Sequence, residues 1–148
     1  MAGAVKKKIN VRAKGQNGER EVVKLLQPVV DRIRKEFELH PIILKRNSMQ
    51  SDRGGSDIAG IPFLAIEVKF QKTELLTSWW NQCVRQAEPG QTPILIFRKN
   101  RTLWKVMMHG YIGGPNSMRL LTTVIVDVED FMRWFGLAYI QYLSENVS

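Results

Sequence analysis

Phe63-Leu64-Ala65-Ile66-Glu67-Val68-Lys69-Phe70 decides the fold, because this stretch has the apolar, β-rich composition of a buried strand. Side chains alternate between the two faces of a strand, so Ala65, Glu67 and Lys69 share one face. The other face is apolar and consists of Leu64, Ile66, Val68 and Phe70. Two charges on an otherwise apolar strand need partners, because an unpaired buried charge is unfavourable. A bound divalent cation is the simplest partner.

The residues just before this strand supply a second acid. Gly55-Ser56-Asp57-Ile58 begins a short strand over 56–59, and the turn at 59–62 predicts a β-hairpin with the Glu67 strand. Asp57 and Glu67 could then hold Mg²⁺, which prefers oxygen ligands and takes one or two carboxylates with water and substrate phosphate. The carbonyl of Val68 is a further candidate ligand. An alternative remains, in which Glu67 and Lys69 form a structural salt bridge on an exposed sheet face.

Helices and strands alternate along the rest of the chain. We expect a helix from Asn17, with a kink or break at Pro28. Its apolar face comprises Val22, Leu26, Val29, Ile33 and Phe37. Strands are predicted over 41–46, 93–98, 102–108 and 120–126, a second helix from Thr73 to about Ala87, and a last helix from 127–130 to about Leu143. This order predicts an α/β fold with a mixed central sheet flanked by helices.

The charge distribution bears on partners and compartment. The formal net charge is +8, and Lys6, Lys7, Lys8, Arg12 and Lys14 precede the first acid. We predict a flexible basic arm over 1–16 and a single domain over 17–148, with nucleic acid as the partner. A solubilising tail is the alternative for the arm. The chain shows no signal peptide or membrane-spanning run, and Cys83 is its only cysteine, so we expect an intracellular protein, in the cytoplasm or nucleoid.

Residues 14–26, Lys-Gly-Gln-Asn-Gly-Glu-Arg-Glu-Val-Val-Lys-Leu-Leu, resemble the opening of archaeal-type Holliday-junction resolvases. Asp57 and Ile66-Glu67-Val68-Lys69 match the next motifs in the same order. That family belongs to the PD-(D/E)XK nuclease superfamily, and the glycine-bearing loop at 53–55 is similar to phage-encoded members, which would act in the host cytoplasm. The resemblance implies a restriction-endonuclease-like αβββαβ core, with Mg²⁺ as cofactor and Mn²⁺ as a substitute.

The resemblance also assigns roles to individual residues. Glu19, Asp57 and Glu67 would be the metal-site acids, and Lys69 the catalytic lysine that orients the attacking water or neutralises developing charge. Glu21 matches a non-catalytic position. Ser56 stands where the family often has proline, and Ser48, Ser51 and Ser56 compete for the role of the family's loop serine. Candidate DNA-binding residues are Lys14, Arg46, Arg53, Ser56, Gln82, Arg98 and Arg101.

The second and the last predicted helices have apolar residues on more than one face. On the second helix, Trp80 and Val84 are four residues apart and are expected in the core. The last helix is apolar around most of its circumference from Phe131 to Tyr142, which indicates a subunit interface or, alternatively, burial within its own fold.

A homodimer suits a four-way DNA junction, because the two required cuts are symmetric. The sequence therefore predicts a Mg²⁺-dependent endonuclease that resolves Holliday junctions. The alternatives are a restriction- or repair-type nuclease of the same superfamily, and a non-catalytic DNA-binding protein.

Overall fold

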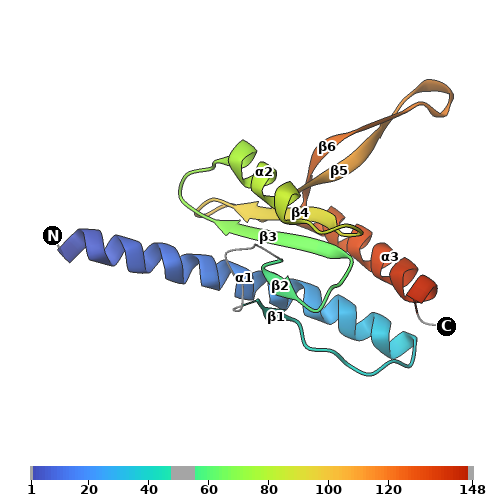
Figure 1. The fold of residues 1–148 in the computed structure, drawn as a ribbon, viewed down its shortest axis with the longest axis horizontal. Coiled ribbons are helices and arrows are strands. Elements are labelled where there is room, and N and C mark those ends of the chain that lie inside the picture. The colour runs from blue at the N-terminus through green and yellow to red at the C-terminus, as the bar shows by residue number, and fades with distance from the viewer. Residues whose placement is uncertain (1, 48–55, 147–148) are drawn as a thin grey trace.

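A mixed four-stranded sheet forms the middle of the molecule (Figure 1). The strand order is β3 (Leu64–Phe70), β4 (Thr92–Arg98), β5 (Lys105–Gly113) and β6 (Arg119–Asp127). β3 and β4 are parallel, whereas β4–β5 and β5–β6 are antiparallel. The computed structural model describes residues 2–47 and 56–146. The predicted fold class, a mixed central sheet flanked by helices, is confirmed.

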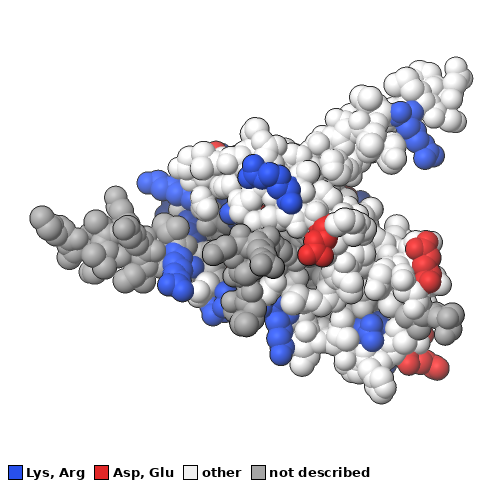
Figure 2. Space-filling model, in the orientation of Figure 1, with Lys and Arg blue, Asp and Glu red and all other residues white. Residues whose placement is uncertain are grey.

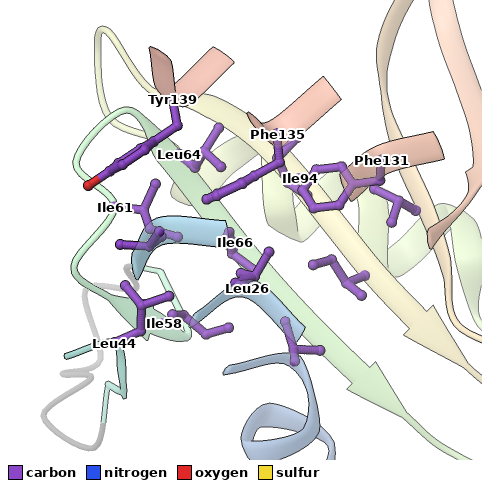
Figure 3. Packing of buried hydrophobic residues seen from close by; sticks show 14 of the residues in the cluster. Leu26, Leu44, Ile58, Ile61, Leu64, Ile66, Ile94, Phe131, Phe135 and Tyr139 are labelled. Carbon is purple, nitrogen blue, oxygen red and sulfur yellow. The ribbon is translucent and has the colours of Figure 1, made fainter. Parts of the chain in front are cut away.

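Helices cover both faces of this sheet. α1 (Ala2–Glu36) and α3 (Val128–Asn146) pack on one face, and α2 (Leu76–Gln86) packs on the other (Figure 1). The larger core lies between the sheet and the first pair of helices, where Leu26, Ile66, Ile94 and Phe135 are buried (Figure 3). The alternation predicted for the Glu67 strand is confirmed, because Leu64, Ile66 and Val68 all belong to this core.

The first helix is longer than the sequence predicted. It begins at Ala2, so the expected start near Asn17 was wrong, and residues 2–16 are part of the helix. Alanine and lysine are strong helix formers, which explains how the segment joins the helix without a cap at Asn17. Pro28 lies inside α1 and does not divide it.

The buried face of α1 also differs at two positions. Val22, Leu26, Val30 and Ile33 are buried, whereas the predicted Val29 is only partly buried and Phe37 is exposed. Phe37 follows the last helical residue, Glu36, and therefore leaves the helical face.

The segment before β3 forms a separate small sheet. β1 (Lys45–Arg46) pairs antiparallel with β2 (Ile58–Ala59), so the predicted regular hairpin between β2 and β3 was wrong. β2 is too short for a ladder with β3, yet the chain at Asp57 is attached to β3. The Asp57 N–H donates to the carbonyl of Ile66 at 2.6 Å.

Three details of the later elements were also predicted wrongly. α2 begins at Leu76 with no side-chain cap, so Thr73 is not its N-cap. Its buried residues are Trp79 and Cys83, one position before the predicted pair. β5 continues to Gly113 rather than ending at the predicted residue 108, and a short 3₁₀ turn at Pro115–Ser117 joins it to β6.

α3 uses most of its apolar surface within its own chain. Phe131, Phe135, Tyr139 and Leu143 are each no more than 2% exposed, and Trp134, Ile140 and Tyr142 pack partly against the same core. Burial within the fold therefore accounts for most of the apolar residues of this helix, and a subunit interface on α3 is not needed to explain its composition.

Candidate active site

Glu67 and Lys69 lie side by side on β3, which is an edge strand of the central sheet. They project from the strand face opposite the main core, toward the α2 layer. Glu67 is only 5% exposed. Its Oε1 lies 3.5 Å from Nζ of Lys69, whose side chain is 19% exposed. The predicted salt bridge therefore exists, but it is buried rather than on an exposed sheet face.

Asp57 is fixed against the backbone of the same strand. Its Oδ2 accepts a hydrogen bond from the Val68 N–H at 2.7 Å, and the residue is 5% exposed. Ser56 fixes the backbone next to Asp57. Its Oγ accepts a hydrogen bond from the Ile66 N–H at 3.0 Å and donates one to the Ile58 carbonyl at 2.8 Å. These bonds hold the Asp57 carboxylate beside the Glu67–Lys69 pair.

Glu19 approaches the same strand from α1. A Cβ on the neighbouring Gly18 would lie 2.9 Å from Cβ of Phe70, so only glycine lets α1 come this close to the end of β3. Gly18 therefore serves the close packing of α1 against β3. The Glu19 carboxylate is paired with Arg46, at 3.0 Å between Oε2 and Nη1.

The electrostatics of Glu67 show that these charges act on one another. Burial raises the pKa of Glu67 to about 7, and the negative charge of Asp57 is the next largest cause. Lys69 acts in the opposite direction, and Glu19 adds a smaller increase. The structure thus brings Asp57, Glu67 and Lys69 together, with Glu19 near enough to perturb Glu67.

This donor set fits a hard divalent cation. Carboxylates that raise one another's pKa are stabilised by an added positive charge. Within 2–47 and 56–146, no three His, Cys, Asp or Glu side chains converge as a ready ligand cage. Mg²⁺ does not need one, since it commonly binds one or two carboxylates with water and substrate phosphate. The site therefore suits a cation shared with a substrate.

A family model described as "Phage putative PDDEXK endonuclease" matches residues 10–129. The chain belongs to this family. The match includes Glu19, Asp57, Glu67 and Lys69, and the last three fit the Asp and Glu-x-Lys pattern after which the superfamily is named. No curated protein and no solved structure matches the chain.

Membership of this endonuclease family supports a nuclease that acts on DNA, and nucleases of this superfamily generally depend on divalent metal. The family model supports the superfamily and not the junction-resolving branch. No described helix has the length and apolar character required to cross a membrane.

The predicted DNA-binding residues fall into different environments in this endonuclease. Arg46 is paired with Glu19, and Ser56 is engaged with the backbone of Ile58 and Ile66. Gln82 is half-buried on α2, and Arg101 is exposed at the β4–β5 turn. Arg53, and with it Ser48 and Ser51, lies outside the described residues.

Lys14 and Arg101 line a groove of about 700 Å³ between α1 and the β4–β5 turn. Nζ of Lys14 lies 4.8 Å from the centroid of the Phe70 ring, which also forms part of the groove. Partial burial and the positive charges of Arg98 and Lys72 lower the pKa of Lys14. Lys14 and Arg101 therefore bring positive charge to the groove, as a phosphate-binding surface requires, although the acid Glu21 lines it too.

Arg98 has a structural environment that the sequence did not reveal. Its Nη2 donates to both carboxylate oxygens of Glu21, at 3.0 and 3.1 Å, and the Trp104 indole N–H donates to Glu21 at 3.0 Å. The guanidinium also lies 3.8 Å from the centroid of the Phe70 ring. Glu21 thus gives Arg98 a structural role, and contact of Arg98 with DNA stays a prediction.

We expect Arg98→Ala to lower the free energy of unfolding by roughly 1–2 kcal/mol, because it removes a partly buried charge pair and a ring contact. For a domain of this size, the midpoint of thermal unfolding should fall by about 3–6 °C. Arg101→Ala is the matched control and should melt like the wild type while binding DNA less tightly. Wild-type melting of Arg98→Ala, with a loss of DNA affinity like that of Arg101→Ala, would contradict the structural role.

Proposed function

We propose that the protein is a Mg²⁺-dependent, structure-selective DNA endonuclease that resolves four-way junctions as a homodimer. The observation that carries the proposal is the Asp57 carboxylate, held by the Val68 N–H beside the buried Glu67–Lys69 pair. Family membership supports the nuclease chemistry, and the likeness of residues 14–26 to junction resolvases supports the substrate.

In the proposed site, the cation is held by Asp57, Glu67 and the Val68 carbonyl. Glu19 is the third carboxylate near the cation. A bound Mg²⁺ would neutralise charge on the scissile phosphate and lower the pKa of the attacking water. The chain's own contribution is to fix these oxygens on one strand edge and to supply the Lys69 ammonium. Lys69 orients the attacking water or neutralises developing charge on the phosphate.

Charge outside the site favours recognition of DNA by shape. The chain carries a net charge of +8, and Figure 2 shows basic side chains spread over the body of the molecule on the face in view. The groove lined by Lys14 and Arg101 adds two basic side chains at which DNA phosphates could bind. Contacts to phosphates position DNA without reading its sequence, so we expect weak base preference.

One gel separates the proposed function from its rivals. A labelled four-way junction and a matched linear duplex are incubated with the protein in Mg²⁺ and in EDTA. We expect paired cuts in the junction with Mg²⁺, little cleavage of the duplex, and none in EDTA. Equal cleavage of both substrates would favour a restriction- or repair-type nuclease. Binding without cleavage under every condition would favour a non-catalytic DNA-binding protein.

A further inference from the structure

The β5–β6 ribbon projects from the body of the molecule (Figure 1). Its surface carries a concentration of exposed apolar side chains. Of the thirteen large hydrophobic residues that are exposed in the described parts of the chain, six lie between Tyr111 and Ile125. They are Tyr111, Ile112, Met118, Leu120, Leu121 and Ile125, with exposed fractions from 47% to 65%. Soluble monomers rarely expose so dense an apolar patch, which marks an interaction surface.

β6 is also an unpaired edge of the central sheet. It pairs with β5 along one side, and no strand formed by residues 2–47 or 56–146 pairs with its other side. No backbone hydrogen bond among the described residues reaches that outer edge between Arg119 and Asp127. Natural edge strands usually carry proline, inward charges or a bulge that prevents pairing. β6 has charges only at its two ends, in the sequence Arg-Leu-Leu-Thr-Thr-Val-Ile-Val-Asp.

This nine-residue strand is complementary to itself. In an antiparallel pair of two β6 strands centred on Thr123, Arg119 of each copy lies opposite Asp127 of the other. Leu121 lies opposite Ile125 in the same arrangement, and these exposed side chains share one sheet face. Opposite charges at the ends and large apolar residues between them are the cross-strand pairs that stabilise an antiparallel ladder.

We infer that β6 pairs with β6 of a second copy, antiparallel about a twofold axis at Thr123, so that the two four-stranded sheets form one eight-stranded sheet. A twofold contact uses the same patch on both copies, as this strand allows. The dimer would provide the two symmetric active sites that cleavage of a four-way junction needs. This role of the dimer rests on the proposed function. The pairing itself rests on β6 alone.

The chemistry of the ribbon favours a protein partner over DNA. Between Val106 and Val126 the only basic side chains are Arg119 and His109, and a phosphate-binding surface requires more positive charge. Figure 2 agrees, because the projecting ribbon is almost entirely uncharged while the body carries most of the basic side chains in view. Another copy of this chain is the partner whose charges match those of β6.

The test uses charge reversal at the ends of β6 and measures mass by sedimentation. Wild type should sediment as a dimer, at twice the 17.0 kDa chain mass. Arg119→Asp places two acids opposite each other at both ends, and Asp127→Arg places two arginines there. Each variant alone should dimerise about tenfold more weakly, or not at all, at low salt. Arg119 faces Gly113 across the β5–β6 ladder, so Arg119→Asp disturbs no opposing charge within the chain.

Mixing the two variants decides the matter, because a heterodimer of Arg119→Asp with Asp127→Arg has opposite charges at both ends. The equimolar mixture should recover the dimer that neither variant forms alone. Asp127 faces Lys105 within the chain, so thermal melts must first show that Asp127→Arg is folded. A monomeric wild type, unchanged dimerisation of both variants, or a mixture that stays monomeric would each overturn the inference. Cleavage of DNA is scored separately, so a failed nuclease assay leaves this result intact.

Discussion

Asp57→Asn should reduce Mg²⁺-dependent cleavage by about three orders of magnitude, because it removes one of the two carboxylates placed to hold the cation. The variant should still fold. An asparagine carbonyl can accept the same hydrogen bond from the Val68 N–H that Oδ2 of Asp57 accepts at 2.7 Å. Binding to a four-way junction should persist or strengthen, since a negative charge facing the phosphates is gone. A labelled junction serves both the cleavage assay and the binding assay.

Asp130→Asn is the control for this prediction. Asp130 lies in the first turn of α3 and pairs with the exposed Arg133, away from the acidic site. It should cleave and melt like the wild type. If Asp57→Asn cleaved as fast as Asp130→Asn, the assignment of Asp57 to the catalytic site would be refuted.

Glu67→Gln should abolish cleavage and, in EDTA, make the protein more stable above neutral pH. The pKa of Glu67 is about 7 in the folded chain, against 4.5 for an unperturbed glutamate carboxyl, with burial as the largest cause. Between these values the folded state binds more protons than the unfolded state, so the free energy of unfolding falls as pH rises. Glu67 therefore stabilises the fold at low pH, and this contribution is lost as pH rises through about 7.

Thermal melts of wild type and Glu67→Gln at pH 5 and pH 8, both in EDTA, measure this difference. The wild type should lose on the order of 2 kcal/mol relative to the variant across that range. Loss of the 3.5 Å contact to Lys69 offsets part of the gain at pH 8. Parallel pH profiles for the two proteins would show that Glu67 does not carry a raised pKa.

The sequence predicted the centre of the fold better than its edges. Alternation over 63–70 correctly placed Leu64, Ile66 and Val68 in the core and Glu67 and Lys69 opposite them. A strand period of two is local, so eight residues suffice to show it. The attachment of Asp57 to β3 is not local in sequence, because it depends on one hydrogen bond to Ile66 and one to Val68. The prediction that Asp57 lies close to the Glu67 strand was correct, but the regular hairpin predicted to bring them together was wrong.

Helix faces were harder to predict where two sets of residues had the same spacing. Trp79 with Cys83 and Trp80 with Val84 are both four apart, and only the position of the sheet selects the first pair for burial. α3 is apolar nearly all round because much of its circumference packs into the core of its own chain. The Arg98–Glu21–Trp104 cluster joins residues from three elements, and no sequence spacing connects them.

Stabilisation by a divalent cation tests the central claim most directly, because it needs no knowledge of the substrate. The midpoint of thermal unfolding is followed at pH 8 as Mn²⁺ is added to wild type, Asp57→Asn and Asp130→Asn. A cation at ten times its dissociation constant adds roughly 1.4 kcal/mol, or about 3–5 °C for a domain of this size. We predict this shift for wild type and Asp130→Asn, and its loss in Asp57→Asn. Equal shifts in all three proteins would contradict a cation site at Asp57 and Glu67.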